Sequence, residues 1–125
     1  MSNITNDEKS DNYVGQIPSL IQFDELETAQ GPRLHRLYYI ISQSINVLTQ
    51  TEVDRLLPFL LRDTIGNDRQ LQLNSLKILY SIMSTQKLKV DPKMVSNTMF
   101  GLLRDSNEIK VRGSIISNLH HLFRF

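Results

Sequence analysis

The sequence Leu-Leu-Arg-Asp occurs twice in this chain, each time at the end of an apolar run with helical spacing. The copies span residues 60–63 and 102–105, so they lie 42 positions apart. A short polar turn and a second apolar run follow each copy. At an offset of 40, five apolar positions of these second runs coincide: Leu71, Leu76, Leu79, Ile82 and Met83 with Val111, Ile116, Leu119, Leu122 and Phe123. A period of about 40 residues built from two helices predicts helical pairs that must stack to bury their apolar sides.

Capping residues and the helical spacing of apolar side chains predict six helices. The expected ranges are about 18–30, 33–49, 51–63, 68–85, 92–103 and 108 to the end. Gly31 and Pro32 are expected to stop the first helix. Thr51 is the expected cap of the third helix, and Asp91 followed by Pro92 predicts the start of the fifth.

Charge divides the chain into two parts. Residues 1–30 carry six acidic side chains against Lys9 alone, a net charge of −5, whereas residues 31–125 carry 13 bases and 7 acids, a net charge of +6. The first dozen residues have almost no large apolar side chain and cannot offset the entropy of ordering. Residues 1–17 are therefore predicted to be a disordered acidic tail, with Tyr13, Val14 and Ile17 docking where the chain enters a helical-repeat domain at 18–125.

Composition excludes several classes of protein. The chain has no cysteine, which rules out disulfides and thiolate metal sites. It has no apolar run of the roughly 18 residues that would span a bilayer. The first residues lack the basic and then apolar layout of a secretory signal. The sequence predicts no membrane association and a cytoplasmic or nuclear location.

The second half of the repeat resembles a known family. Asp105, followed by Val111-Arg112 and a spaced apolar run, is similar to the HEAT-repeat pattern, and Leu57-Pro58-Phe59-Leu60-Leu61 resembles the proline-containing first helix of such repeats. The match covers about residues 52–123, with a degenerate copy suspected at 18–49, and armadillo-type repeats are a close alternative. Gln72 departs from the pattern, because it stands where the earlier copy should carry the arginine.

The resemblance implies an all-α fold, a short right-handed α-solenoid of about three antiparallel helical hairpins. In such repeats the turn aspartate and the helix arginine tie adjacent loops together, which implies a structural role for Asp63, Asp105 and Arg112. Partners of solenoids usually lie along the concave surface formed by the second helix of each hairpin. By helical phase, the residues expected to project there are Tyr39, Gln43, Asn74, Lys77, Ser81, Asn118 and His121.

Residues for catalysis or cofactor binding are sparse. His120 and His121 are adjacent, so their side chains diverge by about 100° on a helix and cannot share a metal ion. His35 has no carboxylate at ligand spacing. The five glycines are scattered rather than gathered in a phosphate-binding loop, and no serine has the glycine-flanked turn of a nucleophile elbow. We expect no enzymatic activity, no metal and no cofactor.

The sequence therefore favours a non-enzymatic protein-binding module, a scaffold or subunit of a larger complex. The alternative is a nucleic-acid-binding repeat protein that contacts phosphates through bases near helix ends. Those bases are Arg33, Arg36, Arg62, Arg69, Arg104, Lys110 and Arg112. A third hypothesis is that the acidic tail folds back on the basic domain.

The last helix of the chain is rich in large apolar residues, namely Leu119, Leu122, Phe123 and Phe125. A solenoid normally closes with a polar outer side. Four interpretations stay open: a protein partner covers this helix, a second copy of the chain covers it, it folds on itself, or the chain is a piece of a longer protein.

Overall fold

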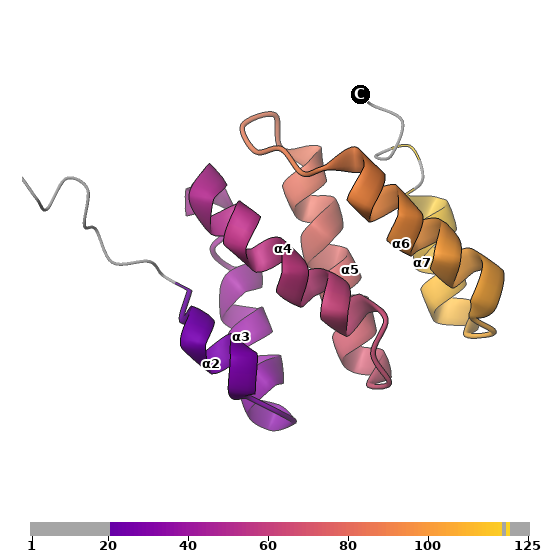
Figure 1. Ribbon diagram of the computed structural model, residues 1–125, viewed down its shortest axis with the longest axis horizontal. Helices are drawn as coiled ribbons and strands as arrows, with labels where there is room; N and C mark the ends of the chain where they lie inside the picture. The colour runs from indigo at the N-terminus through magenta and orange to yellow at the C-terminus, as the bar shows by residue number, and fades with distance from the viewer. Residues whose placement is uncertain (1–20, 119, 121–125) are drawn as a thin grey trace, which may run out of the picture.

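The computed structural model describes residues 21–118 and 120, and within this part of the chain the fold is all-α (Figure 1). Every regular element in these residues is a helix, as the sequence predicts. The elements are α2 (Phe23–Thr28), α3 (Pro32–Ser42), a short 3-10 turn η1 (Ile45–Val47), α4 (Gln50–Thr64), α5 (Arg69–Ser84), α6 (Pro92–Asp105) and α7 (Ile109–Ser117). The predicted boundary between the tail at 1–17 and the domain from 18 lies outside the described residues.

The helices form two layers (Figure 1). Helices α2, α4 and α6 lie nearer the viewer, and α3, α5 and α7 lie behind them. We call α2 and α3 the first pair, α4 and α5 the middle pair, and α6 and α7 the last pair. Helix α5 is central, because it packs against α4 within its own pair and against α3 and α7 on either side. The turns inside the three pairs all lie along the lower edge of the view.

Two helix starts show how well capping can be predicted. Asp91 accepts a hydrogen bond from the Lys93 backbone N–H (3.0 Å), so α6 begins where the sequence indicates. For α4 the predicted cap was two residues too late. Thr49 is the cap: its hydroxyl accepts from the Glu52 N–H (3.1 Å), and the Glu52 carboxylate accepts from the Thr49 N–H (2.9 Å). This reciprocal capping box satisfies two N–H groups that would otherwise lack partners.

The first and second helices differ from the prediction. Helix α2 ends at Thr28, and Gly31 does not close it. Instead Gly31, with φ of 58°, is the residue before α3, and Pro32 is the first residue of α3. Glycine suits this position because other residues rarely adopt a positive φ. Proline suits the first helical position because its missing N–H is not needed there.

Helix α3 stops at Ser42, not near residue 49 as predicted. The Ser42 hydroxyl donates to the Tyr39 carbonyl (2.6 Å), and the Ser44 hydroxyl donates to the Ile40 carbonyl (2.9 Å). Such bonds offer the backbone an alternative to continuing the helix. Ile45 is nevertheless buried in η1. The last helix is also shorter than predicted, because α7 ends at Ser117.

One apolar core runs through all three pairs. The fully buried leucines Leu56 and Leu60 of α4 lie with Leu76 and Leu79 of α5 at its centre. Burying one such side chain contributes about 1.5–3 kcal/mol. Helix α4 runs through Pro58, whose side chain is exposed.

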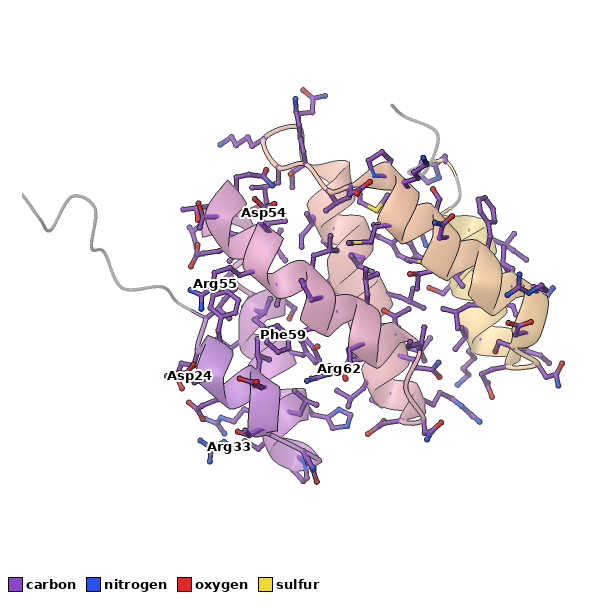
Figure 2. All side chains as sticks on the ribbon, viewed as in Figure 1. Asp24, Arg33, Asp54, Arg55, Phe59 and Arg62 are labelled. Atoms are coloured by element: carbon purple, nitrogen blue, oxygen red, sulfur yellow. The ribbon has the colours of Figure 1, made fainter. Side chains whose placement is uncertain are left out.

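Aromatic rings and guanidinium groups join the first pair to the middle pair (Figure 2). The ring of Phe23 on α2 lies 6.4 Å from that of Phe59 on α4, centroid to centroid. The Arg55 guanidinium carbon lies 4.1 Å from the Phe23 ring centroid, and that of Arg62 lies 5.2 Å from the Phe59 centroid. The contact of Arg55 with Phe23 joins the two pairs, whereas that of Arg62 with Phe59 lies within α4.

Candidate functional site

Four of the seven residues predicted to bind a protein lie together between α3 and α5. Tyr39 of α3 and Gln43, the residue that follows this helix, line a small cavity of about 150 Å³ with Asn74 and Lys77 of α5. Tyr39 is 65% exposed, so most of its surface is accessible to a partner. These four residues come from two helix pairs, so the cavity depends on how the pairs pack.

The other three predicted residues do not line this cavity. Ser81 lies one turn further along α5 and is half-buried. Asn118 follows α7, where its side-chain amide donates to the Ser114 carbonyl (2.9 Å). His121 lies outside the described residues. Because α3, α5 and α7 are neighbours in one layer, Ser81 and Asn118 extend the same layer.

The chemistry of the cavity suits recognition. The Gln70 side-chain amide donates to the Asn74 Oδ1 atom (3.1 Å), which orients the Asn74 amide. An exposed tyrosine ring, two amides and the Lys77 ammonium group offer an apolar surface together with hydrogen-bond donors and acceptors. No group of three or more histidine and acidic side chains in the described part of the chain could hold a metal ion.

Below the cavity, a buried polar network joins the first pair to the middle pair. The Tyr38 hydroxyl donates to the Asp63 carboxylate and lies 3.0 Å from the Phe59 carbonyl oxygen. Asp63 is only 8% exposed, and Arg62 pairs with it through Nε (3.0 Å) and Nη2 (2.9 Å). Arg62 also donates to the Leu26 carbonyl (3.2 Å). Burial, and then the hydrogen bond to Asp63, raise the pKa of Tyr38.

The second copy of Leu-Leu-Arg-Asp has different partners. Arg104 and Asp105 pair with each other (3.0 Å from Nε to Oδ1), and both side chains are largely exposed. Asp105 therefore contacts its own helix rather than an adjacent loop, in contrast to the role implied for it. Tyr80 is the repeat equivalent of Tyr38, yet it interacts with Ser114 of α7. Burial raises the pKa of Tyr80 to about 12.

The helix arginine of the repeat fixes the turn inside its own pair. Arg112 donates to the Leu103 carbonyl and to the Ser106 carbonyl (3.3 Å). At the equivalent position of the middle pair, the Gln72 side chain donates to the Thr64 carbonyl (2.9 Å). Glutamine therefore keeps the turn contact that the sequence pattern assigns to arginine.

Most bases predicted to bind phosphate already have partners. Arg33 forms an ion pair with Glu25, Arg69 with Glu108 (2.7 Å), and Arg104 with Asp105. Arg112 bonds to backbone carbonyls, and Arg62 to Asp63. Within the described residues, only Arg36 and Lys110 of the predicted set have neither an ion pair nor a hydrogen bond from the side chain.

Two of the polar contacts join successive pairs. The His35 Nε2 atom lies 2.9 Å from the Asp68 carboxylate at the start of α5, and Arg69 reaches Glu108 at the start of α7. The hydrogen bond with His35 is the largest cause that lowers the pKa of Asp68. Sequence reasoning missed the His35–Asp68 contact, because 33 residues separate the two side chains.

A repeat signal that sequence reasoning missed lies in α3. Residues 34–42 read LHRLYYIIS and residues 76–84 read LKILYSIMS, with five of nine positions identical at an offset of 42. These identities show that the first pair is similar to the middle pair in sequence as well as in apolar spacing.

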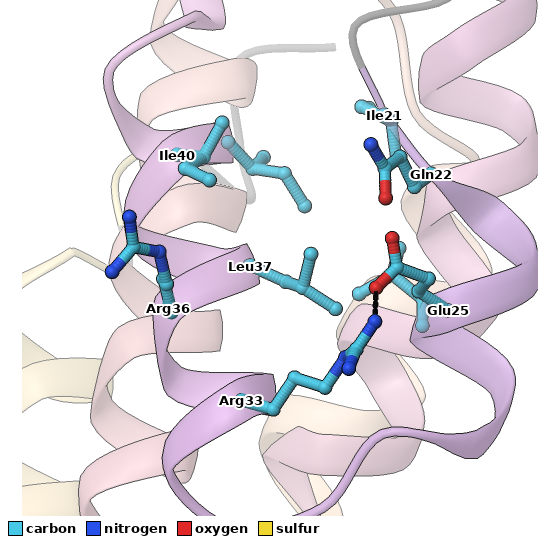
Figure 3. A pocket seen from close by; sticks show the side chains of 9 residues that line it. Ile21, Gln22, Glu25, Arg33, Arg36, Leu37 and Ile40 are labelled. Atoms are coloured by element: carbon cyan, nitrogen blue, oxygen red, sulfur yellow. Dashed lines mark hydrogen bonds and ion pairs between the residues drawn. The ribbon is translucent and has the colours of Figure 1, made fainter.

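A larger cavity of about 330 Å³ lies between α2 and α3 (Figure 3). Its apolar lining includes Leu26, Leu37 and Ile40, and Arg33 and Arg36 are its cationic side chains. Figure 3 shows the ion pair between Arg33 and Glu25 across one end of this cavity. The sequence predicted the two arginines as phosphate-binding residues, but it did not assign the apolar residues beside them to a binding site.

Comparisons with protein-family models, curated proteins and solved structures find no match to this chain. Among the described helices, none is both long enough and apolar enough to cross a membrane.

Proposed function

We propose that this chain is a protein-binding module built as a short solenoid of HEAT-like helical hairpins, acting as a scaffold or complex subunit in the cytoplasm or nucleus. The binding surface in this proposal is the layer formed by α3, α5 and α7. The observation that carries it is the cavity between α3 and α5, where Tyr39, Gln43, Asn74 and Lys77 meet.

The residue types at this cavity support protein recognition. Exposed tyrosine is enriched at protein interfaces because it brings a large rigid surface and a polar end at low entropic cost. The amides of Gln43 and Asn74 can pair with the backbone of a partner, and Lys77 favours a partner with a nearby carboxylate. Two layers of stacked helices also provide the extended surface on which repeat proteins usually bind.

Phosphate binding receives less support. Arg33, Arg69 and Arg104 are paired with carboxylates, so a nucleic acid would have to displace those partners. Binding that depended on Arg36 and Lys110 alone would involve few phosphates and show a shallow dependence on salt. A titration with a short duplex and with a single-stranded RNA at two salt concentrations tests this alternative.

Site-specific crosslinking tests the proposed surface. A photoreactive amino acid at position 39, installed in the full chain in its native cell, should capture a protein that mass spectrometry identifies. With that protein purified, Tyr39→Ala should raise the dissociation constant by about tenfold or more, as expected for a central aromatic contact.

Phe100→Ala is the matched control, because Phe100 is another exposed aromatic residue but lies on α6 in the opposite layer. It should leave the dissociation constant unchanged. Equal losses from the two substitutions, or a loss from Phe100→Ala alone, would move the binding surface away from α3 and α5.

A further inference from the structure

The cavity between α2 and α3 lies at one end of the two layers, where no described helix pair covers it (Figure 3). Ile40 is 42% exposed there, and Leu37 is half-buried. Ile21, the first described residue, also lines the cavity and is itself buried. We call this surface the terminal groove.

The repeat shows what normally covers such a surface. Leu37 and Ile40 correspond to Leu79 and Ile82 of α5, and both of those are fully buried. Residues 79 and 82 lie about 100° and 160° around the helix from Tyr80. Since Tyr80 interacts with α7, this side of α5 is turned toward its other neighbours, α3 and α4. The terminal groove is thus the equivalent surface with no described helix pair before it.

The charge of the groove favours an acidic occupant. Arg36 is exposed and has neither an ion pair nor a hydrogen bond from its side chain among the described residues. The guanidinium of Arg33 is 67% exposed although it pairs with Glu25. An apolar surface beside two arginines suits an apolar segment that has carboxylates next to it in the chain.

We propose that the terminal groove binds the chain's own residues 13–20, Tyr-Val-Gly-Gln-Ile-Pro-Ser-Leu. This segment offers four apolar side chains, Tyr13, Val14, Ile17 and Leu20. Three carboxylates precede it, at Asp7, Glu8 and Asp11, which complement the arginines of the groove.

The short tether favours this segment over an occupant that is not covalently attached to the groove. The segment is continuous with Ile21, which already lines the groove, so its effective concentration is in the range of short linkers, about millimolar. Eight extended residues reach about 26 Å. The α3 stretch from Arg33 to Ile40 rises only about 10 Å, so the segment is long enough to cover it.

Docking of this segment would close the end of the apolar core to other helices. It does not depend on the proposed protein-binding function, because the groove and the cavity that contains Tyr39 share no lining residue. Failure of one proposal leaves the other standing.

Because the chain has no cysteine of its own, two introduced cysteines have no other thiol in the chain to pair with, and the proposal can be tested by disulfide formation. In the full chain, Ile17→Cys combined with Ile40→Cys should form an intramolecular disulfide under mild oxidation, seen as a faster-running monomer on a non-reducing gel. The control combines Ile17→Cys with Arg55→Cys. Arg55 lines an adjoining cavity that shares Ile21, Gln22 and Glu25 with the groove but contains neither Leu37 nor Ile40, so the tether is similar in length while the apolar side of α3 is not involved.

The groove pair should oxidise at least tenfold faster than the control pair. Equal rates would mean random encounter and would overturn the proposal. Disulfide-linked dimers of the groove pair would overturn it in favour of a second copy as the occupant. If the double variant loses helicity by circular dichroism, NMR contacts between the Ile40 methyl groups and residues 13–20 of the unmodified chain decide: their presence supports docking and their absence refutes it.

Discussion

The two copies of Leu-Leu-Arg-Asp end α4 and α6 with the same four residues, yet their charged side chains have opposite surroundings. Asp63 is buried and joined to Tyr38 and Arg62, whereas Asp105 is exposed and paired with its neighbour Arg104. Both helices follow a helix that carries an equivalent tyrosine, but the contact of Tyr80 is with Ser114 of α7. The motif therefore specifies where a helix ends, and packing between pairs decides whether its aspartate becomes part of the core.

The largest difference should appear when each aspartate is removed. Asp63→Ala leaves the Tyr38 hydroxyl and the Arg62 guanidinium without their common partner, and we expect it to lower the free energy of unfolding by about 2–3 kcal/mol. Asp105→Ala should leave the midpoint of unfolding unchanged. Urea denaturation followed by circular dichroism measures both, and equal losses would mean that the two copies have the same structural role.

Removing the tyrosine hydroxyls should give a smaller contrast in the same direction. Tyr38→Phe leaves the buried Asp63 carboxylate with one donor fewer, at a cost of about 1–2 kcal/mol. Tyr80→Phe removes a hydroxyl that interacts with the neutral Ser114 side chain, and should cost about half as much or less. The same urea titration applies, and a larger loss for Tyr80→Phe would contradict the comparison.

The contacts inside the turns should contribute similarly to stability in the two pairs, whereas the two aspartates should contribute differently. Gln72→Ala and Arg112→Ala each remove a donor to a turn carbonyl and should each cost about 1 kcal/mol. Gln72→Arg places in the middle pair the residue that stands at the equivalent position of the last pair, Arg112, and should retain stability within about 0.5 kcal/mol. A severe loss from Gln72→Arg would show that glutamine is required there for packing rather than for the hydrogen bond.

The smallest effect concerns the contact between the first and middle pairs at His35 and Asp68. Because the folded-state pKa of Asp68 is lowered, its stabilisation is present above the unfolded pKa of about 3.9 and is lost as the pH falls through the folded value. Asp68→Asn keeps a residue that can cap α5 but removes the charge. The difference in melting temperature between the wild type and this variant should be small at pH 7 and should shrink as the pH falls below about 3.9. A difference that grew as the pH fell below that value would contradict this assignment.

Local signals in the sequence predicted much of the fold. Asp91 and Pro92 marked the start of α6, and the apolar spacing predicted helices for each of the six that the structure describes. The errors arose where nearby alternatives compete, as between Thr49 and Thr51 for the cap of α4, or where serine hydroxyls end α3 early.

The candidate site was predictable only in part. Helical phase was sufficient to place Tyr39, Gln43, Asn74 and Lys77 at one cavity, because three of them lie on regular helices and Gln43 directly follows α3 with a helical backbone conformation. Contacts between distant residues, such as Tyr38 with Asp63 and His35 with Asp68, depend on the lateral placement of one pair against the next. No local pattern encodes that placement.

The cavity between α3 and α5 has one wall on each of two helix pairs, so it exists only while those pairs are docked. Any partner that binds across it must therefore stabilise the junction between them, by about 2.7 kcal/mol when the free partner is present at 100 times its dissociation constant. Substitutions of Asp63, which does not line the cavity, would loosen its contact with Tyr38 and so weaken binding without touching the partner. Recognition and folding at this junction are thermodynamically linked.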